Sequence, residues 1–200
     1  MLKNLIFDVG EVLFEYRWLY PLELSGVTDE EERKRIGREM FQDPIWVQMD
    51  LGQISLEEAK QYYAEKYPKD AESMAGFLDR VDKIRIDRPR VWEKLPELKK
   101  KGYKIFLLSN YPKELFEEHI SHFTFRKELD GMVVSYQVHL VKPDPQIYRF
   151  LLKKYDLQAE ECLFLDDREE NVKAARELGF DTFQVKSQAE LLEKLDSLLS

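Results

Sequence analysis

The stretch from residue 4 to residue 14, Asn-Leu-Ile-Phe-Asp-Val-Gly-Glu-Val-Leu-Phe, constrains the fold more than any other part of the chain. Residues 4–7 are apolar or neutral and run directly into Asp8, as in a strand that is buried on both faces of a parallel sheet. Such sheets bind ligands at the carboxyl ends of their strands. Asp8, followed by Gly10, therefore predicts either a functional site at this end of the strand or an ordinary turn that the carboxylate caps.

A helical segment follows directly after this first strand. Residues 15–88 carry helix start signals, with capping boxes predicted for Thr28 with Glu31 and for Ser55 with Glu58. Apolar residues recur at the spacing of helices in a small bundle. Because the segment is inserted after the first strand, we expect it to lie over the carboxyl edge of the sheet, where it can close a site.

From residue 89 onward, strand and helix patterns alternate again. Strands are predicted over 104–108, 132–138, 162–165 and 182–185, with helices over 89–102, 112–122, 144–155, 169–178 and 188–199. This alternation indicates a parallel sheet covered by helices on both faces. We therefore expect an α/β protein with a three-layer α/β/α Rossmann-like core, formed by residues 1–14 and 89–200, and a small helical-bundle cap domain over 15–88.

Polar residues stand at or just beyond the predicted strand ends at four places along the chain. They are Asp8, the pair Ser109-Asn110, Lys142 in Val-Lys-Pro-Asp-Pro, and the pair Asp166-Asp167. Taken separately, each has an ordinary structural reading as a turn, a helix cap or a surface lysine. Because parallel strands end at one edge of the sheet, we expect all four to converge there.

The carboxylates in this set are suited to bind a metal ion. Mg²⁺ prefers oxygen ligands and is satisfied by one or two carboxylates together with phosphate oxygens and water. Asp8, Asp167 and the backbone carbonyl of Gly10 are the expected ligands, with Asp166 as a further direct or indirect one. Without a cation, these carboxylates would repel one another and an anionic substrate.

The remaining residues of the set are suited to phosphoryl transfer, in which catalysis consists mainly of positioning and charge stabilisation. Asp8 can act as a nucleophile and form an aspartyl-phosphate. Lys142 would neutralise both Asp8 and the phosphate. The Ser109 hydroxyl and the backbone N–H of Asn110 are expected to donate hydrogen bonds to phosphate oxygens.

These motifs resemble those of the haloacid dehalogenase superfamily, in its branch with a helical cap inserted after the first strand. The matching stretches are Ile-Phe-Asp-Val-Gly-Glu-Val-Leu, Leu-Leu-Ser-Asn, Val-Lys-Pro-Asp-Pro-Gln-Ile-Tyr and Phe-Leu-Asp-Asp-Arg-Glu-Glu-Asn-Val-Lys-Ala-Ala-Arg-Glu-Leu-Gly. The resemblance implies Mg²⁺ and a phosphoaspartyl intermediate at Asp8. It also places Asn171 where relatives often have an asparagine that braces the metal loop, although a helix-surface role fits this residue as well. Members that act on glucose 1-phosphate have a similar glycine-containing first motif.

Gly10 departs from the usual pattern of this superfamily. Most of its phosphatases have a second aspartate at this position, which protonates the leaving group and later activates water. The neighbouring Glu11 should point elsewhere in an extended segment. Because a capped site favours small substrates, we expect a small metabolite such as a sugar phosphate. If Glu11 does not replace the missing acid, anomeric 1-phosphates should be preferred over 6-phosphates because their leaving oxygen is less basic.

Two alternative functions remain open at this level. A 2-haloacid dehalogenase also lacks the second aspartate, but it uses no metal, which would leave Asp166 and Asp167 as an uncompensated acidic pair beside Asp8. A catalytically idle protein that binds phosphorylated ligands or a partner is consistent with Gly10, whereas the presence of Asp8, Lys142 and Asp167 together argues against it.

Composition limits the partners and the compartment. The net charge of −8 disfavours nucleic acid and anionic membranes. The single cysteine, Cys162, lies in an apolar strand and excludes an internal disulfide, which fits a reducing cytoplasm. No signal-like N-terminus or membrane-length apolar run is present. We therefore expect a cytoplasmic monomer that acts on a small phosphorylated substrate.

Overall fold

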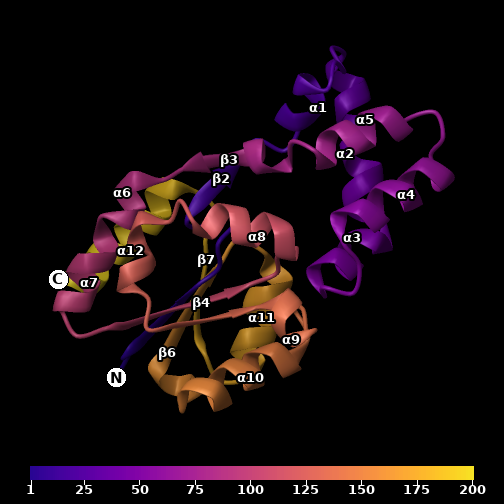
Figure 1. The fold of residues 1–200 in the computed structure, drawn as a ribbon. Helices are drawn as coiled ribbons and strands as arrows, with labels where there is room; N and C mark the ends of the chain where they lie inside the picture. The colour runs from indigo at the N-terminus through magenta and orange to yellow at the C-terminus, as the bar shows by residue number, and fades with distance from the viewer.

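A parallel five-stranded sheet forms the centre of the computed structural model, which describes residues 1–200 (Figure 1). The strand order is β5-β4-β1-β6-β7, so β1 lies in the middle. The bounds are β1 Asn4–Phe7, β4 Lys104–Ser109, β5 Gly131–Val134, β6 Cys162–Asp166 and β7 Asp181–Gln184. Every residue of β1 is buried, as the apolar run before Asp8 predicted.

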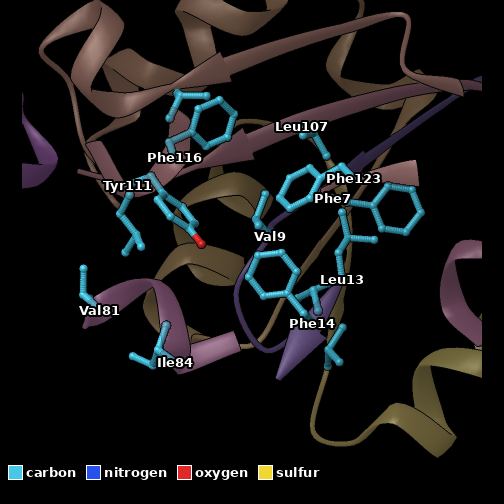
Figure 2. Packing of buried hydrophobic residues seen from close by; sticks show 14 of the residues in the cluster. Phe7, Val9, Leu13, Phe14, Val81, Ile84, Leu107, Tyr111, Phe116 and Phe123 are labelled. Atoms are coloured by element: carbon cyan, nitrogen blue, oxygen red, sulfur yellow. The ribbon is translucent and has the colours of Figure 1, made fainter. Parts of the chain in front are cut away.

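Helices cover both faces of this sheet and produce the expected three layers. One face packs against α6 (Pro89–Trp92), α7 (Lys94–Lys100), α8 (Lys113–Ile120) and α12 (Gln188–Leu199), and the other against α10 (Pro145–Tyr155) and α11 (Glu169–Glu177). Leu5 and Phe7 point into the first layer of side chains and Ile6 into the second. Figure 2 shows Phe7, Leu107, Phe116 and Phe123 among the buried side chains of the first face.

Five helices form a separate group beside the sheet (Figure 1). They are α1 Tyr20–Leu24, α2 Glu30–Gln42, α3 Pro44–Asp50, α4 Leu56–Lys66 and α5 Ala71–Leu78, followed by the 3₁₀ helix η1, Val81–Ile84. The capping box of Ser55 with Glu58 is present. The one predicted for Thr28 is wrong by one residue, because Asp29 caps α2 by accepting from the Glu32 N–H.

A short antiparallel ribbon joins the helical group to the sheet. It consists of β2 (Phe14–Tyr16) and β3 (Arg85–Asp87), which the hydrophobic pattern did not predict. The Arg88 guanidinium donates to the Glu11 carbonyl at 2.5 Å, and the Trp92 indole N–H donates to the Leu13 carbonyl at 2.5 Å. The segment that returns to the sheet after β3 is therefore tied to the loop that follows β1.

Two other elements differ from the prediction. The predicted strand over 132–138 ends at Val134 and continues as a short helix, α9 (Ser135–Val138). The predicted helix over 89–102 breaks at Glu93 into α6 and α7. Pro96 has no N–H to donate to the Trp92 carbonyl, which favours a break at this point. The 3₁₀ helices η2 (Thr124–Glu128) and η3 (Ala159–Glu161) complete the chain, and none of the helices combines the length and apolar character needed to cross a bilayer.

Candidate active site

Asp8 lies at the carboxyl end of the central strand β1 and is the hub of the polar cluster. Its Oδ1 atom accepts a hydrogen bond of 2.7 Å from Ser109 Oγ, at the end of β4. The same oxygen lies 2.9 Å from Lys142 Nζ. The second carboxylate oxygen has no hydrogen-bond donor among the side chains. One oxygen of Asp8 is therefore fixed by two donors, while the other is free to react or to bind a ligand.

Lys142 is buried between two carboxylates. Its Nζ lies 2.6 Å from Asp166 Oδ2 in addition to its contact with Asp8. Burial alone would lower the pKa of this lysine, but the charges of Asp166 and Asp8 outweigh burial and hold the pKa above its ordinary value. The Asn110 side chain fixes the lysine backbone, accepting from the Lys142 N–H at 2.8 Å and donating to the Lys142 carbonyl at 2.9 Å.

The loop after β6 supplies the other two carboxylates. Oxygen atoms of Asp8, Asp166 and Asp167 all lie within 4.8 Å of one another. Asp166 is fully buried and accepts from Asn171 Nδ2 at 3.0 Å and from the Arg168 N–H at 2.9 Å. Asp167 faces the cavity, and burial together with the charges of Asp8 and Asp166 raises the pKa of its carboxyl to about 7.

The charges of this cluster suit a divalent cation. Three carboxylates against the single ammonium of Lys142 leave a formal surplus of two negative charges. Burial and the neighbouring Asp166 charge raise the pKa of Asp8 in spite of Lys142, as expected for a cluster that lacks positive charge. The Oδ1 atom of Asn171 is buried beside the cluster without a hydrogen-bond partner. An ion with its bound water would satisfy both the charge and this orphaned oxygen.

Gly10 lines the same cavity, and the ring of Tyr16 lies directly against it. A Cβ atom built on Gly10 would approach Tyr16 Cε2 to 2.5 Å. Tyr16 therefore occupies the space that a side chain at position 10 would need. Tyr16 has Tyr111 as a neighbour, whose hydroxyl is 2.7 Å from His119 Nδ1. Burial and the neighbouring Tyr111 raise the pKa of Tyr16 well above its ordinary value, so the phenol keeps its proton.

The polar cluster opens into a cavity of about 550 Å³. The side facing the cluster is largely aromatic, because Trp18, Phe41 and Trp46 of the helical group line it. These rings pack edge to face, with centroids 4.1 Å apart for Trp18 and Phe41 and 4.4 Å apart for Phe41 and Trp46. Trp18 remains 40% exposed. The two tryptophans, which look like bundle core in the sequence, therefore present ring surface to the cavity.

The structure brings all the predicted site residues together but also adds others. Tyr16 and Asp50 line the cavity, and neither has a neighbour in the sequence that marks it as functional. Glu11 also reaches the cavity, yet its carboxylate accepts from the Tyr16 N–H at 2.9 Å and lies 3.4 Å from Arg88. The side chain of Asn110 positions Lys142, a role that adds to the expected backbone contact with phosphate.

Two histidines and the single cysteine lie outside the lining of the cavity. His119 is buried and bonded to Tyr111, whereas His122 is exposed and lies 3.4 Å from Glu118. The Cys162 thiol donates to the Gln158 carbonyl, and burial raises the pKa of the thiol to about 11. Cys162 is therefore a buried residue of β6, as its apolar surroundings in the sequence indicate.

A parallel α/β sheet with an aspartate after its central strand, opposed by a buried lysine and a second acidic loop at the same edge, has the Rossmann-like architecture of enzymes that bind their substrates at the carboxyl ends of the strands. Residues 2–179 match the haloacid dehalogenase-like hydrolase family model, and the chain belongs to that family. The family resemblance inferred from the motifs is thus confirmed.

Individual relatives add detail to this family assignment. The chain is 26% identical to D-ribitol-5-phosphate phosphatase of Bacteroides thetaiotaomicron, over the full length of both proteins. It is 28% identical to the sesquiterpene phosphatase astK of Aspergillus oryzae, covering 88% of this chain and 86% of the relative. Among solved structures, a HAD family enzyme of B. thetaiotaomicron in complex with magnesium and inorganic phosphate superposes with a TM-score of 0.74. The match is 25% identical and covers 94% of this chain and 96% of that one.

Proposed function

We propose that the protein is a Mg²⁺-dependent phosphatase that hydrolyses a small phosphorylated metabolite through a phosphoaspartyl intermediate at Asp8. The observation that carries the proposal is the geometry of Asp8, with one oxygen held by Ser109 and Lys142 and the other free toward the cavity. A carboxylate held in this way can attack phosphorus without moving.

The other residues of the cluster divide the remaining work. Lys142 balances the charge of Asp8 and of the phosphoryl group during transfer. Ser109, which donates to Asp8, also lines the cavity within reach of a phosphate oxygen. Asn110 holds the lysine loop through two backbone hydrogen bonds. These residues orient the substrate and stabilise the charge that develops on the equatorial oxygens.

Asp8, Asp167 and the Gly10 carbonyl would hold the Mg²⁺ ion, with Asp166 and Asn171 bracing them. The bound ion supplies positive charge to the phosphoryl group and removes repulsion between the carboxylates and the substrate. The magnesium and phosphate bound by the B. thetaiotaomicron HAD enzyme support this assignment. A metal-free dehalogenase is disfavoured because it would leave the charge surplus of the cluster unbalanced.

A sugar or polyol phosphate is the substrate class supported best. The ribitol-5-phosphate phosphatase matches over its full length. The helical group over residues 15–88 serves in this proposal as a cap whose aromatic wall covers the apolar face of a sugar or polyol chain. A preference for anomeric phosphates follows only if no other side chain protonates the leaving oxygen.

The same aromatic wall favours a second candidate substrate. Trp18, Phe41 and Trp46 would also cover an isoprenoid chain, and the A. oryzae relative is a sesquiterpene phosphatase. The two candidate substrates differ in the polarity of the organic group attached to the phosphate, which is polar in a sugar or polyol and apolar in an isoprenoid. Phosphate release from a panel of sugar, polyol and prenyl phosphates, measured with and without Mg²⁺, separates them.

The proposed function is tested by metal dependence and by trapping. EDTA should abolish phosphate release, and added Mg²⁺ should restore it. Acid quenching during turnover of an aryl phosphate should leave phosphate covalently bound to the wild-type protein but not to Asp8→Asn. Phosphate release that is unaffected by EDTA and leaves no phosphoprotein would contradict the proposal. The dehalogenase alternative would then have to be tested directly.

A further inference from the structure

We propose that Asp50, at the carboxyl end of α3, acts as the general acid and base of the reaction in place of the side chain that Gly10 lacks. The proposal rests on the phosphatase function proposed above and deepens it. It assigns to the helical group a chemical step, in addition to covering the substrate.

The backbone around Asp50 is fixed against the sheet domain by three contacts. The Ser135 hydroxyl donates to the Asp50 carbonyl at 2.5 Å, and the His139 ring, through Nδ1, donates to the Leu51 carbonyl at 2.7 Å. Gly52 packs so closely on Tyr136 that a Cβ atom there would lie 2.8 Å from the Tyr136 carbonyl oxygen. These contacts hold the end of α3 in one place over the carboxyl edge of the sheet.

The Asp50 carboxyl faces the cavity without a bonding partner from the protein. The residue is 9% exposed and lines the same cavity as Asp8. No side-chain donor, backbone N–H or cation within salt-bridge distance contacts its carboxyl group, and its oxygens are not among the side-chain atoms sealed away from the cavity. A carboxyl in a largely buried residue gains free energy from a hydrogen-bond partner. A substrate oxygen or a water molecule in the cavity is the partner that can reach it.

The other ionisable groups of the cavity are already committed. Asp8 and Asp167 belong to the acidic cluster, and Glu11 is bound by Arg88 and the Tyr16 N–H. Burial raises the pKa of Tyr16, which keeps its proton. Asp50 is the one carboxyl of the cavity lining that neither belongs to the acidic cluster nor is held by a donor of the protein.

The direction of the reaction places the leaving oxygen on the side of Asp50. In an in-line displacement the nucleophile and the leaving oxygen lie on opposite sides of phosphorus. Asp8 approaches from the strand end, so the leaving oxygen departs toward the helical group. Asp50 is the acidic side chain that this group contributes to the cavity.

The surroundings of Asp50 favour its protonated form. Burial is the largest influence and raises its pKa, the charges of Arg168 and Lys142 lower it, and that of Asp8 raises it, with a net value of about 7. Its position at the end of α3 acts in the same direction as burial, because a carboxylate is disfavoured at a helix C-terminus. A carboxyl with a pKa near neutrality can both donate and accept a proton.

The two chemical steps balance as follows. An Asp8 oxygen forms a bond to phosphorus while the bond from phosphorus to the leaving oxygen breaks, and the leaving oxygen takes the proton of Asp50. Water then attacks the aspartyl-phosphate and gives its proton to the Asp50 carboxylate as the bond from Asp8 to phosphorus breaks. The products are an alcohol and inorganic phosphate, and both carboxyl groups regain their initial state.

The dependence of rate on the leaving group tests this assignment. Asp50→Asn should lower kcat/KM for an alkyl phosphate such as glucose 6-phosphate by roughly 10²–10⁴-fold, the usual contribution of a general acid. The loss for p-nitrophenyl phosphate should be less than about tenfold, because nitrophenolate leaves without a proton. A plot of log kcat/KM against leaving-group basicity should therefore be shallow in the wild type and steep in Asp50→Asn.

The second step provides an independent readout. Asp50→Asn should release nitrophenol from p-nitrophenyl phosphate in a burst followed by slow turnover, because water attack on the aspartyl-phosphate loses its base. Glu11→Gln is the matched control, since it alters another carboxyl of the cavity and should leave the slope of the plot unchanged. Asp50→Ser makes the same predictions if the asparagine variant proves insoluble.

Two results would overturn the assignment. An equal loss for every leaving group would make Asp50 a binding or structural residue, and a steep plot in the wild type would mean that no group protonates the leaving oxygen. In the latter case the preference for anomeric phosphates returns. Absence of Mg²⁺-dependent hydrolysis of p-nitrophenyl phosphate by the wild type would instead contradict the proposed function itself.

Discussion

The two walls of the cavity differ in origin and in chemistry. The polar wall comes from the ends of β1, β4 and β6 and from the loop that carries Lys142. Apart from Asp167, its charged side chains are each held by at least one other polar side chain. The facing wall comes from the helical group and consists of aromatic rings and the single acid Asp50. The first wall has the residues expected for the phosphoryl group, which all substrates of such an enzyme share, and the second has those that meet the variable organic part.

This difference explains what could be predicted from the sequence. The residues of the polar wall could be predicted from the sequence because a polar residue directly after a buried strand has few structural reasons to be there, and a parallel sheet brings such residues to one edge. The residues of the facing wall could not be predicted in this way. Trp46 and Phe41 have the spacing of bundle core, and Asp50 resembles any acidic residue at a helix end. Only the contacts of α3 with Ser135 and His139 place Asp50 at the site.

The β2–β3 ribbon and the α9 turn were missed for a related reason. Each ribbon strand is three residues long, too short for a periodic pattern to develop. The residues Tyr136-Gln137-Val138 have strand propensity, but Ser135 bonds to the backbone of Tyr111 and Asp50 and turns the chain away from the sheet.

The largest effect should follow from a change at the polar wall. Asp8→Asn is nearly isosteric but removes the nucleophile, so kcat should fall by at least about 10³-fold on every substrate. Phosphate release, measured beside a circular dichroism spectrum, checks that activity is lost while the fold is kept. Turnover within tenfold of the wild type would exclude Asp8 as the nucleophile.

A change inside the helical group should affect the free energy of unfolding more than the rate of hydrolysis. Asp43 is buried at the α2–α3 junction and accepts from Lys66 at 2.7 Å and from the hydroxyls of Tyr62 and Tyr67 at 3.1 and 3.0 Å. Asp43→Ala leaves these donors unpaired and should lower the free energy of unfolding by roughly 2–4 kcal/mol. Urea unfolding measures the loss.

The control for Asp43→Ala is Asp29→Ala, which removes only the exposed cap of α2 and should cost less. Hydrolysis of p-nitrophenyl phosphate by folded Asp43→Ala should stay close to the wild-type rate. A large loss of this rate at a temperature where the variant is folded would show that the geometry of the polar wall depends on the helical group.

Acid should lower the stability of the protein through the buried His119, whose ring is bonded to Tyr111. Burial lowers the pKa of His119 from 6.5 to about 4. Between these values the unfolded chain binds a proton that the folded protein does not, so stability falls as pH falls and is complete above pH 6.5. The loss attributable to His119 between pH 7 and pH 4.5 should be roughly 2 kcal/mol.

Urea unfolding at several pH values measures this effect through the difference between the wild type and His119→Gln, which should lack this part of the pH dependence. His122→Gln is the control, because His122 is exposed and lies three residues after His119. Its free energy of unfolding should change with pH as that of the wild type does. Parallel curves for the wild type and His119→Gln would mean that His119 is already protonated in the folded protein.

The smallest effect is expected at the aromatic wall. Trp46→Ala removes ring surface from the cavity and should raise KM for a sugar or prenyl phosphate by roughly fivefold, equivalent to about 1 kcal/mol of contact. The KM for acetyl phosphate, whose organic part is much smaller, should change little. An equal rise for both substrates would assign Trp46 to the shape of the site rather than to recognition of the organic group.

The contact of Tyr16 with Gly10 has a consequence for redesign of this active site. An aspartate at position 10 would overlap the Tyr16 ring as it lies in the structure, because even a Cβ atom there approaches the ring to 2.5 Å. A Gly10→Asp variant must therefore displace this ring before its carboxyl can enter the cavity. Positions 10 and 16 are coupled in this sense, and an engineered acid at position 10 calls for a smaller residue at position 16 in the same variant.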